Sequence, residues 1–293
     1  MASRFNLDLL SASLLIVCLG VGVNVHATTY GASFEDSKWQ AASSELECRL
    51  AQPIPQFGEG VFSKKAGYGL SFWLQTYENP FAAGKARLVV EAPEWKPGIV
   101  SRPIGTIDVN QERVPVYLDQ PQANIVLASL NTGLMPTIAG SKLHALDTSD
   151  WIKVAVSSAN FQPAYQEYTR CLTDLLPVSF EQIARSALFF DTNNASINDD
   201  VKRQLDLIAR YVKADKSISR IFIDGHTDDL GTLPINKSLS KRRASVIANY
   251  LKSSGISKNK IVSRYHADKY PALKNDSDAN RARNRRVTIR LEK

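Results

Sequence analysis

Apolar and polar positions alternate with a period of two through much of the stretch 45–159. In 70–75, for example, Leu70, Phe72 and Leu74 alternate with less apolar neighbours, and 87–90 and 151–156 are further strand candidates. Prolines interrupt the pattern at Pro53, Pro55, Pro80, Pro93, Pro97, Pro103, Pro115 and Pro121. Short strands between such turns are typical of an antiparallel β-rich domain, either a small barrel or a sandwich. A single helix is predicted here, over 125–131.

After residue 171 the apolar spacing becomes helical. The stretch 199–212 carries four apolar residues on one face, with Asn198 as a suitable N-cap, and a second helix is predicted from 240 to 253, where Gly255 ends it. Strands are predicted near 188–190 and over 221–223, 261–265 and 287–291. The order β-α-β-α-β-β indicates an α/β sandwich with helices on one face of a mixed sheet.

The predicted fold class is therefore α+β, with an N-terminal antiparallel β-rich domain and a C-terminal α/β sandwich. A length of 293 residues fits about two domains. We place their boundary near Pro177 and expect domains at 28–175 and 176–293. The sequence has no long linker and no internal repeat.

Residues 1–27 resemble a targeting segment. A long apolar run from 9 to 25 follows the single basic residue Arg4, and Ala27 offers a small residue for cleavage. This pattern predicts a signal peptide over 1–27. A membrane anchor is the alternative, but a run of about 17 residues is marginal for a span and no basic cluster follows it. We therefore expect an exported chain.

Removal of the signal peptide, which includes Cys18, leaves two cysteines, Cys48 and Cys171. An even pair in an oxidising compartment predicts a disulfide. Two free buried thiols are the alternative.

The charge is divided unevenly between the halves. Residues 28–175 hold 12 Lys and Arg against 15 Asp and Glu, a net charge of −3, whereas 176–293 hold 23 against 13, a net of +10. For an exported protein the available polyanions are cell-wall polymers and lipid head groups rather than nucleic acid. A solvated surface explains most of these charges equally well.

Asp228 and Arg243 are the strongest candidates for binding chemistry. The strand at 221–223 ends close to Asp228, and Arg243 falls in the first turns of the helix predicted to begin at Ser240. A carboxylate that takes an ammonium and a guanidinium that takes a carboxylate suit a zwitterionic ligand. The helix N-terminus would add N–H donors for the same anion, and Gly225 would allow close backbone approach. A structural salt bridge between Asp228 and Arg243 is the alternative.

The sequence indicates no catalytic or metal site. His226, Asp228 and Asp229 lie close together, but a metal site usually needs a further ligand from elsewhere, and neither HExxH nor paired CxxC motifs occur. The nucleophile elbow, the phosphate loop and the dinucleotide fingerprint are absent as well. We therefore expect a non-enzymatic protein without a cofactor.

The C-terminal half resembles the OmpA-like peptidoglycan-associating family. The motifs are GHTDD at 225–229, LSKRRA at 239–244 and RARNRRV at 281–287. The resemblance implies binding of the diaminopimelate-containing stem peptide of peptidoglycan, with Asp228 as the acid and Arg243 as the arginine. It also implies that Thr227 and Asn236 line the pocket and that Arg285 belongs to the basic tail motif. The family's glycine-rich strand end is replaced by YHA at 265–267.

The N-terminal half resembles periplasmic T-ring components of the sodium-driven polar flagellar motor. The similarity rests on LECRLAQPIPQFGEGVFS at 46–63, WIKVAVSSANFQPAY at 151–165 and Cys171. It implies a periplasmic protein at the basal body and outer membrane, whose β-rich domain docks on basal-body ring proteins and the partner MotX. The C-terminal domain would hold the wall and so indirectly support the stator complex. An envelope tether without a flagellar role is the alternative, and a wall-cleaving hydrolase is a third, disfavoured class.

Overall fold

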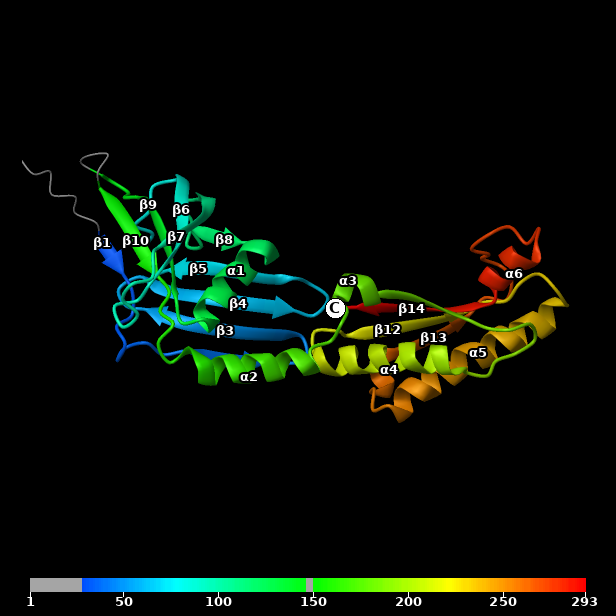
Figure 1. Cartoon of the computed structure of the whole chain (residues 1–293). Helices are drawn as coiled ribbons and strands as arrows, with labels where there is room; N and C mark the ends of the chain where they lie inside the picture. Colours follow the sequence, from blue (N-terminus) through cyan, green and yellow to red (C-terminus); the bar gives the residue numbers. More distant parts are fainter. Residues whose placement is uncertain (1–27, 146–149) are drawn as a thin grey trace, which may run out of the picture.

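The molecule is elongated, with the two halves of the chain at its two ends and the C-terminus near the middle (Figure 1). The structure is a computed structural model that describes residues 28–145 and 150–293. The signal peptide predicted for 1–27 lies outside the described residues. The predicted α+β class is confirmed, because helices and strands alternate in the C-terminal half and strands dominate the N-terminal half.

Two five-stranded sheets form most of the N-terminal half. The first is antiparallel and has the order β2 (Gln40–Ser43), β3 (Glu47–Ile54), β4 (Gly58–Lys65), β5 (Leu70–Thr76) and β8 (Val116–Leu118). The second has the order β1 (Thr28–Tyr30), β10 (Trp151–Ala155), β9 (Met135–Ser141), β6 (Gly84–Glu91) and β7 (Arg102–Val109). It is antiparallel except where β1 pairs with β10.

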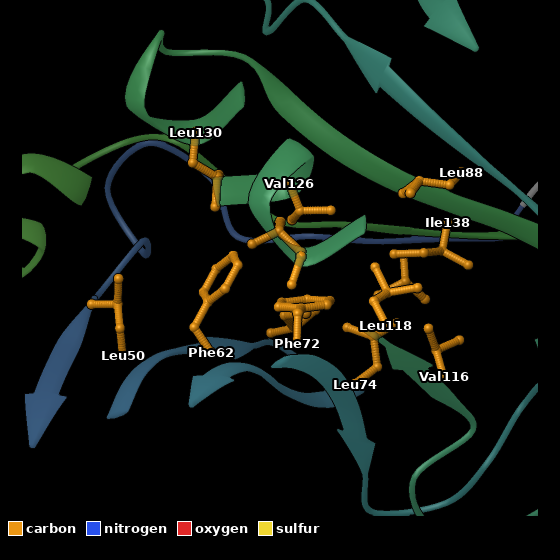
Figure 2. Close-up of a cluster of buried hydrophobic side chains, with 14 of the residues drawn as sticks. Leu50, Phe62, Phe72, Leu74, Leu88, Val116, Leu118, Val126, Leu130 and Ile138 are labelled. Atoms are coloured by element: carbon orange, nitrogen blue, oxygen red, sulfur yellow. The ribbon is translucent and has the colours of Figure 1, made fainter. Parts of the chain in front are cut away.

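Helix α1 (Gln120–Asn131) packs between the two sheets. Figure 2 shows Val126 and Leu130 from this helix facing Phe62 and Phe72 of β4 and β5, with Ile138 of β9 beside them. These five side chains are at most 1% exposed. The alternation of β5 places Phe72 and its neighbours on this face, which is the pattern that predicted the strand.

Helix α2 (Phe161–Asp174) was not predicted from the sequence. Its buried residues Phe161, Ala164, Tyr168 and Cys171 have helical spacing, so the signal was present in the sequence. The helix lies along β2 and β3, where Cys171 forms the predicted disulfide with Cys48 at the start of β3. This disulfide is confirmed by the structure.

The C-terminal half contains a four-stranded mixed sheet. Its strands, in spatial order, are β11 (Arg185–Phe189), β14 (Arg286–Glu292), β12 (Arg220–Gly225) and β13 (Ile261–Tyr265). Only the pair β12 and β13 is parallel. The helical elements are α3 (Phe180–Ile183), α4 (Asp199–Ala214), α5 (Leu233–Ser253), the 3₁₀ helix η1 (Lys258–Lys260) and α6 (Asp278–Asn284).

Helices α4 and α5 cover one face of this sheet, as predicted (Figure 1). Asn198 caps α4 through a hydrogen bond from the Val201 amide, also as predicted. Two details of the sequence prediction for this half were wrong. Helix α5 begins at Leu233, after Thr232, rather than at Ser240, and the short helix α6 lies between the last two strands. Seven residues with one buried position give no helical period, so the pattern did not reveal α6.

The two halves meet at a tight joint. Ala66, at the end of β4, is buried in the hydrophobic core of the C-terminal half. Gly67 has φ +75°, and a Cβ at this position would lie 2.2 Å from the amide nitrogen of Ser179. The Glu45 carboxylate pairs with Arg210 at 2.7 Å, and the backbone carbonyl of Glu45 accepts a hydrogen bond from the amide of Leu176. These contacts hold the halves in one orientation.

Replacing both Cys48 and Cys171 by alanine should destabilise the N-terminal half by roughly 2–5 kcal/mol, because the unfolded chain loses a long cross-linked loop. All four tryptophans lie between 39 and 151, so tryptophan fluorescence during denaturant unfolding reports this half. The unreduced parent, denatured and treated with a thiol reagent, should label at neither position. An unchanged unfolding midpoint or two labelled thiols would contradict the assignment.

Candidate functional site

The ends of three strands meet around Arg243, whose side chain is fully buried. Its Nε donates to the carbonyl of Asn194 at 2.8 Å, Nη1 to that of His226 at 3.0 Å and Nη2 to that of Asp191 at 2.8 Å. Asp191 and Asn194 follow β11, and His226 follows β12. One guanidinium therefore joins the loops that leave two non-adjacent strands.

Burial lowers the pKa of Arg243 to about 10, and the nearby Asp228 carboxylate works against that shift. The guanidinium still carries its charge at neutral pH. A guanidinium has five N–H groups, and three are used on carbonyl oxygens, which leaves two for other acceptors. The ring of Phe190 lies 5.3 Å from the guanidinium carbon.

Asp228 forms its ion pair with Arg285, at 3.0 Å between carboxylate and guanidinium. Both side chains are largely buried, with 7% of Asp228 and 15% of Arg285 exposed. Arg285 also donates to the carbonyl of Phe190 at 3.2 Å, and its own carbonyl accepts the Phe190 amide. A buried pair with further hydrogen bonds of this kind holds a charge in place at low dielectric.

A cavity of about 240 Å³ opens beside these charges. Its lining comprises Thr192, Asn193, Asp228, Leu230, Gly231, Ile235, Asn236, Leu239, Arg243 and Arg285. Asn236 donates to the carbonyl of Asp228 at 3.3 Å and so fixes the loop that carries the acid. An acid, two arginines and two amides thus surround one small hollow with apolar sides.

The structure brings four of the five predicted binding residues together and leaves Thr227 outside the lining. Thr227 is buried, and its amide donates to the carbonyl of Ala267. The alternative salt bridge between Asp228 and Arg243 is replaced by the pair with Arg285. The prediction that Arg243 lies in the first turns of its helix is also wrong. Helix α5 begins at Leu233, ten residues before Arg243, so the free N–H groups of its first turn follow Gly231 in the chain instead.

Gly225 has the close backbone approach that was predicted, although the neighbour is helix α5. A Cβ there would lie 2.2 Å from the carbonyl oxygen of Ser240. Ala267, in the segment that departs from the family's glycine-rich pattern, has φ +53°. Glycine adopts this left-handed conformation without strain, whereas alanine adopts it here at some cost.

Sequence reasoning missed two parts of the site. The polar run after β11, with Asp191 and Asn194, supplies carbonyls to Arg243, and a polar run at a strand end was the available signal. Asn284, fully buried in the last motif, accepts the amides of Ala272 and Leu273 and donates to the Leu273 carbonyl. It therefore fixes the segment before α6.

His226 lies on the other side of the same strand end. Its ring is buried, stacks on His266 at 5.1 Å between centroids, and has no partner for Nδ1 among the described residues. Burial, with the nearby Arg286 and His266, lowers the pKa of His226 to about 4, and only Asp224 opposes the shift. The ring is therefore neutral at neutral pH.

Comparison with known proteins assigns the C-terminal half to a family. Residues 189–285 match the OmpA family, so the C-terminal half is an OmpA-family domain. Outer membrane protein A of Bordetella avium is 32% identical over 115 residues, which are 39% of this chain and 59% of that protein. The C-terminal domain of Helicobacter pylori MotB is 25% identical over 37% of this chain and 84% of that chain, with a TM-score of 0.35.

Residues 30–177 match the MotY N-terminal domain, half of the chain. The sodium-type flagellar protein MotY of Vibrio parahaemolyticus is 29% identical over 265 residues, which are 89% of either chain. The chain therefore belongs to the MotY family. The relatives named here are flagellar and outer-membrane proteins rather than enzymes. In the described part of the chain, no helix has the length and apolar character needed to cross a membrane.

The His226 environment predicts a pH dependence of folding. The His226 ring takes up a proton near pH 6.5 in the unfolded state and only near pH 4 in the folded state. The contribution of the neutral ring to the free energy of unfolding is therefore complete above pH 6.5 and is lost as the pH falls towards 4. The loss is roughly 3 kcal/mol. Denaturant unfolding at several pH values should show a flatter profile for His226→Asn than for the parent. His144→Asn, at an exposed histidine, is the control and should follow the parent. Identical profiles for the parent and His226→Asn would contradict the prediction.

Proposed function

We propose that the chain is a non-enzymatic periplasmic component of the flagellar motor that anchors to peptidoglycan through residues 176–293. The observation that carries this proposal is the hollow in which Asp228 and two buried arginines face the same small volume. A diaminopimelate side chain ends in an ammonium and a carboxylate on one carbon. Asp228 suits the ammonium, and the two uncommitted N–H groups of Arg243 suit the carboxylate.

Contacts within the chain hold the side chains of the site in place, which favours binding. Arg243 is fixed by three carbonyls, Asp228 by Arg285, and the backbone of Asp228 by Asn236. Side chains held in this way lose little further freedom when a ligand arrives. Several relatives of the C-terminal half are named peptidoglycan-associated lipoproteins, among them one from Pseudomonas putida that is 28% identical over 107 residues.

We further propose that the two domains bind different partners. Residues 28–175 would dock on basal-body ring proteins and MotX, and residues 176–293 would hold the wall, so that stator units assemble around the rotor. The family match of the N-terminal half and the flagellar relative that spans 89% of this chain support this division. An envelope tether between wall and outer membrane is the second candidate, favoured by the outer-membrane relatives of the C-terminal half alone.

Replacing Asp228 by asparagine should weaken binding to purified peptidoglycan by roughly 2–5 kcal/mol, because the ligand ammonium then loses a buried charged partner. Co-sedimentation at increasing wall concentrations measures the effect. Asp229→Asn is the matched control, since Asp229 is exposed and lies outside the hollow. Equal sedimentation of the two variants would overturn the pocket assignment, and soluble fragments released by the parent would indicate a hydrolase.

Deleting the gene should abolish swimming while filaments remain, since the proposal places this protein at the motor rather than in filament export. Complementation with the parent or Asp229→Asn should restore swimming, and complementation with Asp228→Asn should not. Swimming in soft agar, filament staining and leakage of a periplasmic enzyme are measured together. A leaky envelope with normal swimming would contradict the motor function and favour the tether.

A further inference from the structure

The face of the C-terminal sheet opposite α4 and α5 carries two arginines side by side. Arg185 of β11 and Arg290 of β14 are directly paired across the two strands, and Phe222 of β12 is the next neighbour of Arg290. Figure 1 shows this face on the side away from α4 and α5, between the N-terminal half and the segment that carries α6. No helix of the described chain covers it in the way that α4 and α5 cover the other face.

A hollow of about 480 Å³ lies over this part of the sheet. Ala187 and Thr288, which are paired across β11 and β14, form its floor, and Arg185, Asp224 and Arg290 line it as well. The hollow is larger than the one at the strand ends, and its volume falls in the range of ligand-binding clefts.

Not all of the charges here are committed. Asp224 is satisfied by both nitrogens of one edge of Arg264 and by His266, and Arg290 pairs with Glu292 at 2.8 Å. The guanidinium of Arg185, in contrast, has no ion pair or hydrogen bond with any described residue, and it is exposed. The hollow thus presents an unpaired cation beside a second cation.

The arrangement is unfavourable for the sheet alone. Like charges directly opposite each other on neighbouring strands destabilise the pairing. Arginine at both positions therefore conflicts with the local rule for a stable sheet, and such conflicts are typical of binding sites. An anion seated between the two guanidiniums would remove the repulsion and gain two charge-assisted contacts.

The ring of Phe222 adds a second binding feature. The guanidinium carbons of Arg264 and Arg290 lie 5.0 and 4.5 Å from its centroid, so the ring holds both side chains flat on the sheet. Arginine and aromatic residues that are held in this way are the residue types enriched at binding hot spots.

We propose that this face, centred on Arg185, Arg290 and Phe222, is a docking surface for an acidic segment of a protein partner. Carboxylate side chains of the segment would lie between the two guanidiniums, and its apolar atoms would cover Phe222 and Ala187. The charge of the host half, net +10 over residues 176–293, favours an acidic partner.

The surface fits a polypeptide better than a lipid bilayer. In Figure 1 the N-terminal half lies at one end of the C-terminal sheet and the α6 segment at the other, an arrangement that favours a narrow chain over a flat membrane. Apolar side chains beside the two cations, Phe222 and Ala187, also fit a mixed peptide better than a uniform row of phosphates.

This surface is separate from the proposed wall pocket. Arg185 begins β11, whereas Asp191 at the pocket follows its end, six residues later. At about 3.3 Å per residue this corresponds to roughly 20 Å. The proposal therefore does not depend on wall binding, and the two can be tested independently.

The test uses the mature chain, residues 28–293, and a fluorescein-labelled octaglutamate peptide, followed by anisotropy at about 0.15 M salt. The double variant Arg185→Gln with Arg290→Gln should bind the peptide at least about tenfold more weakly than the parent. The matched control, Lys213→Gln with Lys216→Gln, removes the same charge from two exposed lysines and should bind like the parent. The arginine double variant should sediment normally with the wall.

Thermal unfolding shows whether the arginine variants fold. Because like-charge repulsion is removed, the double variant should melt at a temperature no lower than that of the parent. Equal peptide binding by the arginine and lysine double variants would overturn the proposal. Binding of the parent to phosphatidylglycerol vesicles that depends on the same two arginines would overturn the protein partner in favour of a membrane.

Discussion

The buried guanidinium of Arg243 is the interaction on which the C-terminal site depends. Its three hydrogen bonds to the carbonyls of Asp191, Asn194 and His226 tie together loops that leave strands not adjacent in the sheet. A cation this deeply buried is tolerated only when it is hydrogen-bonded, and these three carbonyls supply the hydrogen bonds. The carbonyls therefore fix the loops, and the loops place Asp228 beside Arg285. Because Arg243 serves both the site and the local fold, a mutation of Arg243 tests both at once.

The joint between the two halves of the chain is a second constraint on the structure. The joint around Ala66 and Gly67 packs the end of β4 into the C-terminal core, and the disulfide fixes α2 to β3 a few residues before the joint. The strand-end pocket lies at the far end of the C-terminal sheet from this joint. The start of β11 and the end of β14 lie near the joint, whereas the end of β11 and the start of β14 lie near the pocket. A protein that holds the wall at one end and a motor at the other would transmit force through such a stiff connection.

Sequence patterns predicted the parts of the fold that depend on regular apolar spacing. The strands around Leu70, Ile221 and Val287 and the helix from Asp199 were predicted correctly, and the two cysteines predicted their own pairing. The start of α5 was missed because Leu233 and Ile235 in its first turn are exposed and do not continue the apolar spacing of the helix, yet Asn236 is buried there and donates to the Asp228 carbonyl. The choice of Arg285 over Arg243 as the partner of Asp228 depends on the position of the residue that follows α6 beside the loop that follows β12, which no spacing in the sequence encodes. Backbone carbonyls as ligands of Arg243 are equally invisible, because every residue carries one.

The most direct test of the account is a titration of isotope-labelled residues 28–293 with a soluble stem tripeptide that contains diaminopimelate, followed by amide chemical shifts. We predict saturable shifts confined to 191–194, 226–231, 236 and 285, and no such shifts with a tripeptide in which lysine replaces diaminopimelate and so lacks its second carboxylate. Equal responses to the two peptides would contradict the role of Arg243, and shifts confined to the open face of the sheet would contradict the pocket itself.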